Sequence, residues 1–236
     1  MTVDVPFRFA AARVGLSFVL CPYLLRALSI ETIITFFAAS IAIGVAPGPD
    51  NIFVLTQSAL RGPKAGLLVT LGLCTGLIGH TLAVALGLAA LLKASALAFT
   101  VLKLIGAGYL LYLAWRAFAD SSDELPEESV ELRDRDIRLY RRGIVMNITN
   151  PKVSLFFLAY LPQFVDPDQG SVGLQIGILG ALFMLMTLIV FGGIALLAGQ
   201  LGRILRESPR IRVVMNRIAG VVFVTLALKL LLSQAS

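Results

Sequence analysis

Charged side chains are scarce in this sequence of 236 residues. Asp, Glu, Lys and Arg make up 14% of the chain and hydrophobic residues 58%, whereas soluble domains average about 25% charged residues. The mean hydropathy is +0.88. This composition excludes a soluble globular domain and predicts an all-α protein that spans the lipid bilayer.

Cysteine and histidine are also scarce. The two cysteines, Cys21 and Cys74, stand alone in apolar runs, which excludes a disulfide framework, a thiol relay and a cysteine-based zinc site. The single histidine is His80. A metal centre would require several His, Asp or Glu side chains in the spans, and an enzyme would require a second catalytic group beside Asp50 or His80. We therefore expect no metal, no cofactor and no enzymatic activity.

Long hydrophobic runs, by contrast, are abundant. A helix needs about 20 mostly apolar residues to cross the hydrocarbon core, and six segments of the chain meet this requirement. One polar stretch, rich in Asp, Glu and Arg, separates the first three from the last three. The expected spans are 29–60, 64–92, 96–118, 143–164, 172–201 and 213–232. With the polar loop at 119–142, the chain divides into two three-helix halves, 29–118 and 143–236.

The segment 1–28 lies outside this scheme. Its apolar part is interrupted by Pro22 and is too short for a comfortable span, and no convincing cleavage site follows it. We interpret it as an interfacial helix or as a dispensable extension from an upstream, mis-assigned start codon, with a cleaved signal peptide or a short seventh span as alternatives.

Positive charge is concentrated in alternate loops. Lys and Arg number 20 against 14 Asp and Glu, which gives a net charge of +6. In an apolar chain such an excess indicates cytoplasmic loops rather than contacts with nucleic acid, so no nucleic-acid partner is expected. The basic residues cluster between spans one and two, three and four, and five and six. We therefore expect these loops to be cytoplasmic and both ends of the six-span core to be periplasmic.

Two spans at corresponding positions in the halves contain residues that an uninterrupted helix would avoid. Proline removes a backbone donor and clashes with the preceding turn, so both spans are expected to break. Because each half has three spans, the halves would be inverted in the membrane, and matching breaks in inverted halves point to a transporter's binding site. The first break holds Pro47, Gly48, Pro49, Asp50 and Asn51, and the second holds Asn147, Asn150, Pro151 and Lys152.

The two breaks also match in depth. Asp50 precedes the end of span one by ten residues, and Lys152 follows the start of span four by nine, which places each roughly 14 to 15 Å from the same membrane surface. Isolated charges there are costly. We therefore expect Asp50 and Lys152 to face one polar cavity and to pair there. The alternatives are architectural proline kinks and a lysine that reaches the surface.

Several segments resemble the lysine-exporter and homoserine/threonine-resistance (LysE/RhtB) family of bacterial amino-acid exporters. The similarity covers about 28–232. Its most specific parts are 47–51, 66–80, 102–110 and 147–165, which include the sequences Pro-Gly-Pro-Asp-Asn, Asn-Pro-Lys and Leu-Pro-Gln-Phe-Val. The resemblance implies a six-span, homodimeric protein of the bacterial inner membrane that exports amino acids or close derivatives in exchange for protons. The segment 1–28 departs from the family pattern, because members usually begin shortly before span one.

An amino acid is a zwitterion, so its site must hold a carboxylate and an ammonium group. Amides freed at the start of a half-helix can hold the carboxylate with help from Lys152, while Asp50 or freed carbonyls can hold the amine. The asparagines suit such a pocket, and capping of the half-helices is an equally good role for them. The substrate-binding candidates are Pro47, Gly48, Pro49, Asp50, Asn51, Asn147, Asn150, Pro151 and Lys152.

Proton coupling needs a group whose charge changes during the cycle. Asp50 is the first candidate, because losing its charge would weaken both its pairing with Lys152 and its hold on the substrate. His80, inside span two, is the second candidate as a proton relay, although a lone histidine in a helix more often has a packing role. Export of another small solute or of a metal cation, with the same architecture, is the alternative function.

Overall fold

The computed structural model describes residues 28–94, 96–119, 136–207 and 209–232, and within these ranges the chain is helical apart from short connections. The expectations for 1–27 and 120–135 lie outside the described residues. The longer helices are α2 (Ile30–Val45), α3 (Pro49–Arg61), α4 (Pro63–Ala94), α5 (Ala96–Ala119), α6 (Asp136–Thr149), α8 (Val172–Glu207) and α9 (Pro209–Leu232). Between α6 and α8 lie α7 (Pro151–Leu155), a π-helical turn (Phe156–Tyr160) and two 3₁₀ turns (Leu161–Phe164, Pro167–Gln169).

Three helices are long and apolar enough to cross a membrane. Their candidate spans are Pro63–Gly87, Val172–Gln200 and Val213–Leu232. Two bent pairs, Ile30–Val45 with Pro49–Arg61 and Asp136–Thr149 with Pro151–Phe164, also qualify when each pair is taken as one span. The structure thus has three to five candidate spans among the described residues. The expected third span is present as helix α5 but is not among these candidates.

The polar loop ends earlier than its charge suggests. Residues 136–142 belong to α6, although their charged side chains led us to place them in the loop. One face of this first stretch is apolar, and Leu139 on it is 2% exposed. Lys64 donates to Asp136 at 2.5 Å, and the Arg142 guanidinium lies 4.5 Å from the centre of the Phe53 ring. Tertiary contacts with α3 and α4 therefore extend α6 beyond its apolar residues.

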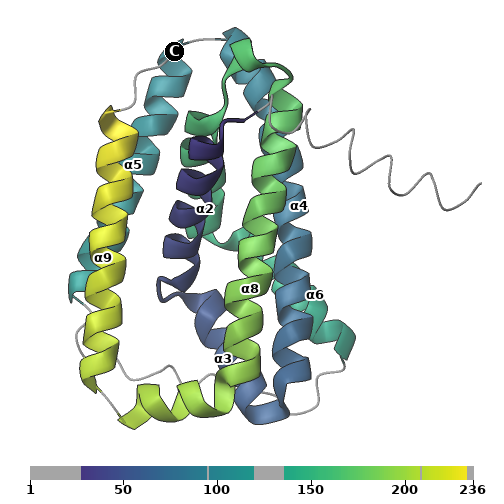
Figure 1. The fold of residues 1–236 in the computed structure, drawn as a ribbon, viewed down its shortest axis with the longest axis vertical. Helices are drawn as coiled ribbons and strands as arrows, with labels where there is room; N and C mark the ends of the chain where they lie inside the picture. Colours follow the sequence, from purple (N-terminus) through teal and green to yellow (C-terminus); the bar gives the residue numbers. More distant parts are fainter. Residues whose placement is uncertain (1–27, 95, 120–135, 208, 233–236) are drawn as a thin grey trace, which may run out of the picture.

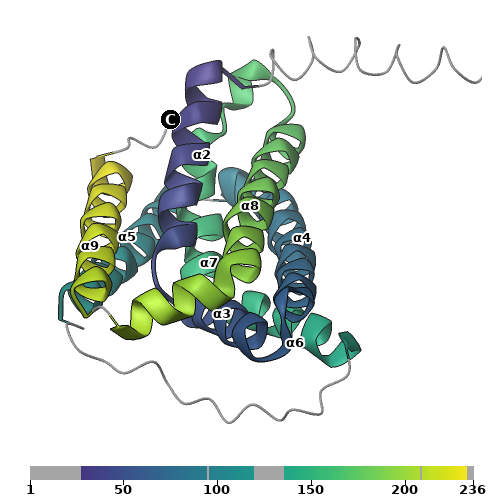
Figure 2. The ribbon, with the colours of Figure 1, turned by 60° about the horizontal axis from the view of Figure 1, so that its bottom comes forward.

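The helices form two groups with α2 between them (Figure 1). In one group α4 packs against both α6 and α8, and in the other α5 packs along α9. The broken helix α2–α3 lies against α8, and the broken helix α6–α7 lies against α4. Figure 2 shows both breaks near the centre of the helical group. The broken helix of each half thus packs against the helix that follows the broken helix in the other half, which is α8 for α2–α3 and α4 for α6–α7.

Glycine allows one of these contacts to be close. A Cβ atom added at Gly143 of α6 would collide with the Val69 carbonyl oxygen of α4, and one added at Gly72 would collide with the Tyr140 carbonyl oxygen. One added at Gly76 would lie 2.7 Å from the side chain of Asn147. The Gly72-x-x-x-Gly76 pattern therefore lets the backbones of α4 and α6 touch at the level of the second break.

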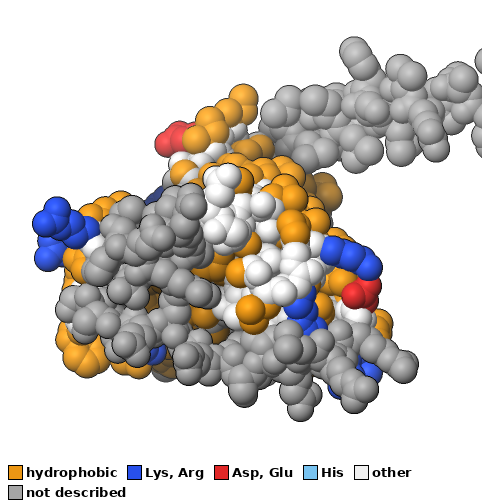
Figure 3. All heavy atoms as spheres, turned by 90° about the horizontal axis from the view of Figure 1, so that it is seen from below, with side chains coloured by type: hydrophobic (Ala, Val, Ile, Leu, Met, Phe, Trp, Pro, Cys, Tyr) orange, Lys and Arg blue, Asp and Glu red, His pale blue; other side chains and the backbone are white. Residues whose placement is uncertain are grey.

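Basic side chains share one end of the molecule. The α3–α4 and α8–α9 connections lie at the bottom of Figure 1, and the end of α5 and the start of α6 lie in its lower half. Lys and Arg side chains stand out on this end, where it is seen from below in Figure 3. Those described near these connections include Arg61, Lys64, Arg116, Arg138, Arg141, Arg142 and Arg210.

Candidate functional site

The two broken helices meet through polar side chains. The helix axis bends by 62° between α2 and α3 and by 50° between α6 and α7. At the meeting point, Asn150 Nδ2 donates to Asp50 Oδ2 at 2.6 Å. Asp50 is 3% exposed and Asn150 is 4% exposed. A buried carboxylate of one half is therefore hydrogen-bonded to the connection between helices of the other half.

The first break is stabilised by side chains that replace missing helical partners. The last carbonyl groups of a helix lack intrahelical donors. At the end of α2, Lys152 Nζ donates to the Ala46 carbonyl at 3.1 Å, and Asn51 Nδ2 donates to the Gly44 carbonyl at 2.8 Å. A cation beside a helix C-terminus is also favoured by the helix dipole. Lys152 thus holds the second broken helix against the first.

The second break is capped by its own asparagine. Asn150 Oδ1 accepts from the Lys152 backbone N–H at 3.0 Å, as an N-cap residue does. The same side chain contacts Asp50 through its amide nitrogen. Asp50 and Lys152 do not form a direct ion pair. Among the described residues, an N–O distance within 4.0 Å between opposite charges is found for Lys64 and Asp136 and not for these two. Asn150 connects the two charged residues instead.

Asp50, Asn147 and Lys152 line one small cavity. Its volume is about 20 Å³, which suits roughly one water molecule. The walls come from both broken helices and from α4 and α8. The lining residues are Ile43, Gly44, Asp50, Leu73, Asn147, Lys152, Val153, Phe183, Met186, Thr187 and Phe191.

Some polar atoms at the cavity have no hydrogen-bond partner among the residues that the structure describes. Asp50 Oδ1 and Asn147 Oδ1 are buried acceptors without a hydrogen bond. An ammonium group has three donors, and Lys152 directs one of them to Ala46. Buried polar groups are normally satisfied. The cavity therefore presents unused acceptors beside a cation that has donors to spare.

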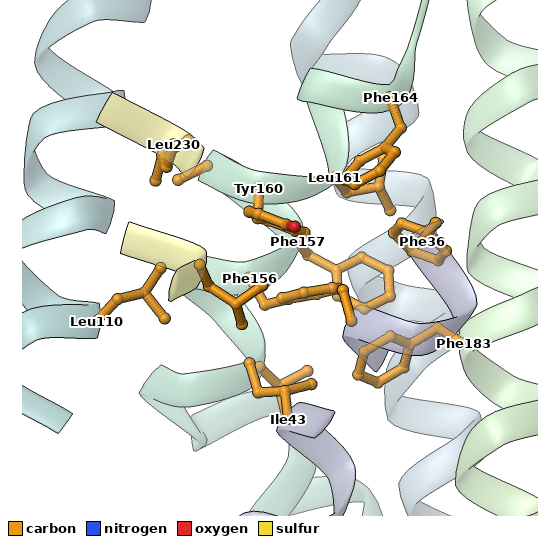
Figure 4. Packing of buried hydrophobic residues seen from close by; sticks show 14 of the residues in the cluster. Phe36, Ile43, Leu110, Phe156, Phe157, Tyr160, Leu161, Phe164, Phe183 and Leu230 are labelled. Atoms are coloured by element: carbon orange, nitrogen blue, oxygen red, sulfur yellow. The ribbon is translucent and has the colours of Figure 1, made fainter. Parts of the chain in front are cut away.

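Two apolar clusters contribute walls to the cavity. In the first, the aromatic rings of Phe36, Phe156, Phe157 and Phe183 pack together, with centroid separations of 5.1 to 6.3 Å, where α2, α8 and the π-helical turn meet. Figure 4 shows this cluster with Phe183 and Ile43, which also line the cavity. The second apolar cluster contributes Leu73 and Phe191 to the lining. It contains Phe53, Val54, Ala65, Val69, Leu73, Leu139, Phe191 and Ala195.

His80, on α4, contacts the backbone of Asn147, which lines the cavity. Its Nε2 lies 3.2 Å from the Asn147 carbonyl oxygen. That oxygen can only accept, so Nε2 carries the proton of this hydrogen bond. The ring also lies against Phe157, with centroids 5.6 Å apart. His80 thus supports the last turn of α6, whereas its role as a proton relay stays a prediction.

The remaining predicted residues shape the backbone. Pro47, Pro49 and Pro151 are exposed on the outside of the breaks, so their contribution is to end one helix and begin the next. A Cβ atom at Gly48 would lie 3.0 Å from Lys152 Nζ. The missing side chain at this glycine leaves room for the lysine ammonium group.

Sequence reasoning missed the wall that α8 contributes. Phe183, Met186, Thr187 and Phe191 line the cavity, but they lie in a continuous apolar helix that has no break. Apolar residues that face lipid, protein or a cavity look alike in a sequence. A hydroxyl group at Thr187 was the single polar signal, and it donates to the Phe183 carbonyl of its own helix.

No group of three or more His, Cys, Asp and Glu side chains within the described ranges lies close enough to hold a metal ion. The polar groups of the site are the carboxylate of Asp50, the ammonium group of Lys152 and the amides of Asn147 and Asn150.

Comparisons with known proteins agree with the resemblance seen in the sequence. The family model described as LysE type translocator matches residues 41–234. An uncharacterized membrane protein of Vibrio cholerae is 32% identical over 208 residues, which cover 88% of this chain and 100% of that protein. The uncharacterized membrane protein YrhP of Bacillus subtilis is 29% identical over 78% of this chain and 91% of its own. The uncharacterized membrane protein PA4757 of Pseudomonas aeruginosa is 30% identical over 83% of this chain and 93% of its own length.

No solved structure matches the chain. The family match covers both breaks and every residue that lines the cavity. The chain therefore belongs to the LysE type translocator family of membrane transporters.

Proposed function

We propose that this translocator exports amino acids across the bacterial inner membrane in exchange for protons, with the basic loops in the cytoplasm. The observation that carries the proposal is the cavity between the two broken helices. It holds one buried carboxylate, Asp50, and one buried ammonium group, Lys152, together with acceptors that have no partner.

A zwitterion complements this arrangement. Its ammonium group would donate to Asp50 Oδ1 and Asn147 Oδ1, the two unpaired acceptors at the cavity. Its carboxylate would accept from the donors that Lys152 does not direct to Ala46. Charge-assisted hydrogen bonds of this kind contribute about 1.5 to 3 kcal/mol each. Each charge of the substrate would therefore meet an opposite charge in a place with little water.

The helices must move for a substrate to enter. A cavity of about 20 Å³ holds roughly one water molecule and no amino acid. The apolar clusters that line the cavity would have to separate to open it, first to one membrane surface and then to the other, which is alternating access around a central site. The reciprocal packing of each broken helix on the other half supports such rocking of two inverted halves.

Proton exchange is assigned to Asp50. Its Oδ2 already accepts from Asn150, and its Oδ1 is buried without a hydrogen-bond partner among the described residues. Protonation would remove the negative charge that holds the substrate ammonium group and would thereby favour release. Proton and substrate would then compete for one carboxylate, which is the simplest coupling for antiport. His80 adjoins the site through Asn147 and is the second titratable group near it.

Another small solute or a metal cation is the alternative cargo. A metal cation would be repelled by the buried Lys152 ammonium group, which lines the same cavity as Asp50. A zwitterion satisfies both charges at once. The arrangement therefore favours the amino acid.

The test is transport by the purified protein in proteoliposomes that are loaded with labelled amino acids, with and without an imposed pH gradient. We expect efflux of at least one amino acid and faster efflux when the gradient drives protons inward. Asp50→Asn should abolish the gradient-dependent part. Asp136→Asn is the matched control, because it makes the same change at a carboxylate that is 62% exposed. Unchanged gradient-driven efflux by Asp50→Asn would overturn the coupling assignment.

A further inference from the structure

We infer that the transported amino acid carries no net charge and has an aliphatic side chain, whose size is limited by Met186. This inference rests on the proposed function and deepens it, because it names the substrate class of the same cavity. Three observations carry it: the balance of charge at the cavity, the chemistry of its walls and the position of Met186.

The charged groups at the cavity are balanced. Asp50 and Lys152 are its charged lining residues, and the α-ammonium and α-carboxylate groups of an amino acid would occupy both. A substrate with a third charge, such as lysine or glutamate, would bring it among apolar side chains without a counterion. Burying an unpaired charge in a membrane protein is costly. Discrimination against such substrates is expected to be roughly a hundredfold.

The remaining walls are apolar. Ile43, Leu73, Val153, Phe183, Met186 and Phe191 supply them. The hydroxyl proton of Thr187 is used within its own helix, where it is donated to the Phe183 carbonyl at 2.9 Å. A polar substrate side chain would lose its hydrogen bonds to water without replacement. An aliphatic side chain would gain van der Waals contacts with these walls.

Met186 is placed to set the size limit. It is fully buried and lines the cavity from α8. Its sulfur atom occupies the space beside Gly44 of α2, where an added Cβ atom would lie 2.5 Å from it. A methionine side chain is flexible and adapts to irregular spaces. Met186 is therefore the wall that a larger substrate must displace.

The experiment measures efflux of labelled alanine, leucine, phenylalanine, lysine and glutamate from proteoliposomes that contain the full-length protein. For the natural sequence we expect alanine or leucine to leave roughly a hundredfold faster than lysine or glutamate. Met186→Ala should raise the ratio of phenylalanine to leucine efflux several-fold, and Met186→Val should raise it less. Leu185→Ala is the matched control, because the neighbouring Leu185 is 49% exposed and faces away from the cavity.

The outcomes separate the inference from the proposed function. Efflux of lysine or glutamate as fast as that of leucine would overturn the neutral substrate class and leave amino-acid export intact. An unchanged phenylalanine-to-leucine ratio in both Met186 variants would overturn the size limit. No efflux of any amino acid by folded, inserted protein would overturn the proposed function, and the inference with it.

Discussion

Substitution of Gly143 by alanine tests the contact between α4 and α6 that positions the second break. An added Cβ atom would collide with the Val69 carbonyl oxygen and would lie 3.1 Å from the Cα atom of Gly72. Both obstacles are backbone atoms of α4, so no side-chain rotation can relieve the overlap. The two helices would have to separate by roughly 1 Å to restore ordinary van der Waals distances.

The cost can be worked from this geometry. Overpacking of a well-packed interface costs about 1 to 3 kcal/mol, and a rigid backbone obstacle places Gly143→Ala near the upper end. Replacing glycine by alanine inside a helix stabilises the folded state by about 0.5 to 1 kcal/mol, which offsets part of this cost. The net loss of about 2 kcal/mol corresponds to a decrease in Tm of about 4 to 8 °C for a chain of this size.

The assay is thermal unfolding of purified protein in detergent, with Gly79→Ala as the matched control. Gly79 lies on α4, and a Cβ atom there would meet nothing within 4 Å. The control should therefore keep or slightly raise the Tm. If Gly143→Ala melted at or above the temperature of the natural protein, the close contact of α4 with α6 would be wrong.

Three further predictions concern single side chains. Asp50→Asn should remove gradient-driven efflux, as measured in proteoliposomes, because it removes the one negative charge at the cavity; efflux that still follows the gradient would contradict this role. His80→Gln should lower the rate of efflux several-fold while preserving its dependence on the pH gradient, because an amide can still donate to the Asn147 carbonyl; loss of gradient dependence would instead establish His80 as a proton relay. Lys64→Ala should lower the Tm by less than about 4 °C, because the side chains of Lys64 and Asp136 are 77% and 62% exposed and exposed ion pairs contribute about 0 to 1 kcal/mol; a larger decrease would show that this pair stabilises the start of α6.

Much of the architecture could be predicted because its signals are local. The prolines beside Gly48 and after Asn150 interrupt a helix whatever its tertiary surroundings. Both breaks are found where they were predicted. The prediction of a loop to residue 142 was wrong at its end. The first turns of α6 are held by contacts with α3 and α4, and such contacts are not encoded in local composition.

The candidate site was only partly predictable. Asp50, Asn147 and Lys152 stood out because polar residues are costly in a membrane span, and the structure brings all three to one cavity. The direct pairing of Asp50 with Lys152 was not found, because Asn150 accepts from the backbone of one and donates to the carboxylate of the other. Such an arrangement depends on the relative positions of two half-helices, which spacing along the chain does not give.

The sequence by itself determined that this chain is a helical membrane protein with two interrupted helices and a charge beside each interruption. These properties follow from the cost of polar and helix-breaking residues in lipid, which acts on each segment separately. Only the tertiary structure decided which face of α8 lines the cavity, which glycines allow α4 and α6 to touch, and which donor each carbonyl group accepts. Apolar side chains have nearly the same transfer free energy whether they face lipid or protein, so their partners are set by shape and packing across the whole molecule.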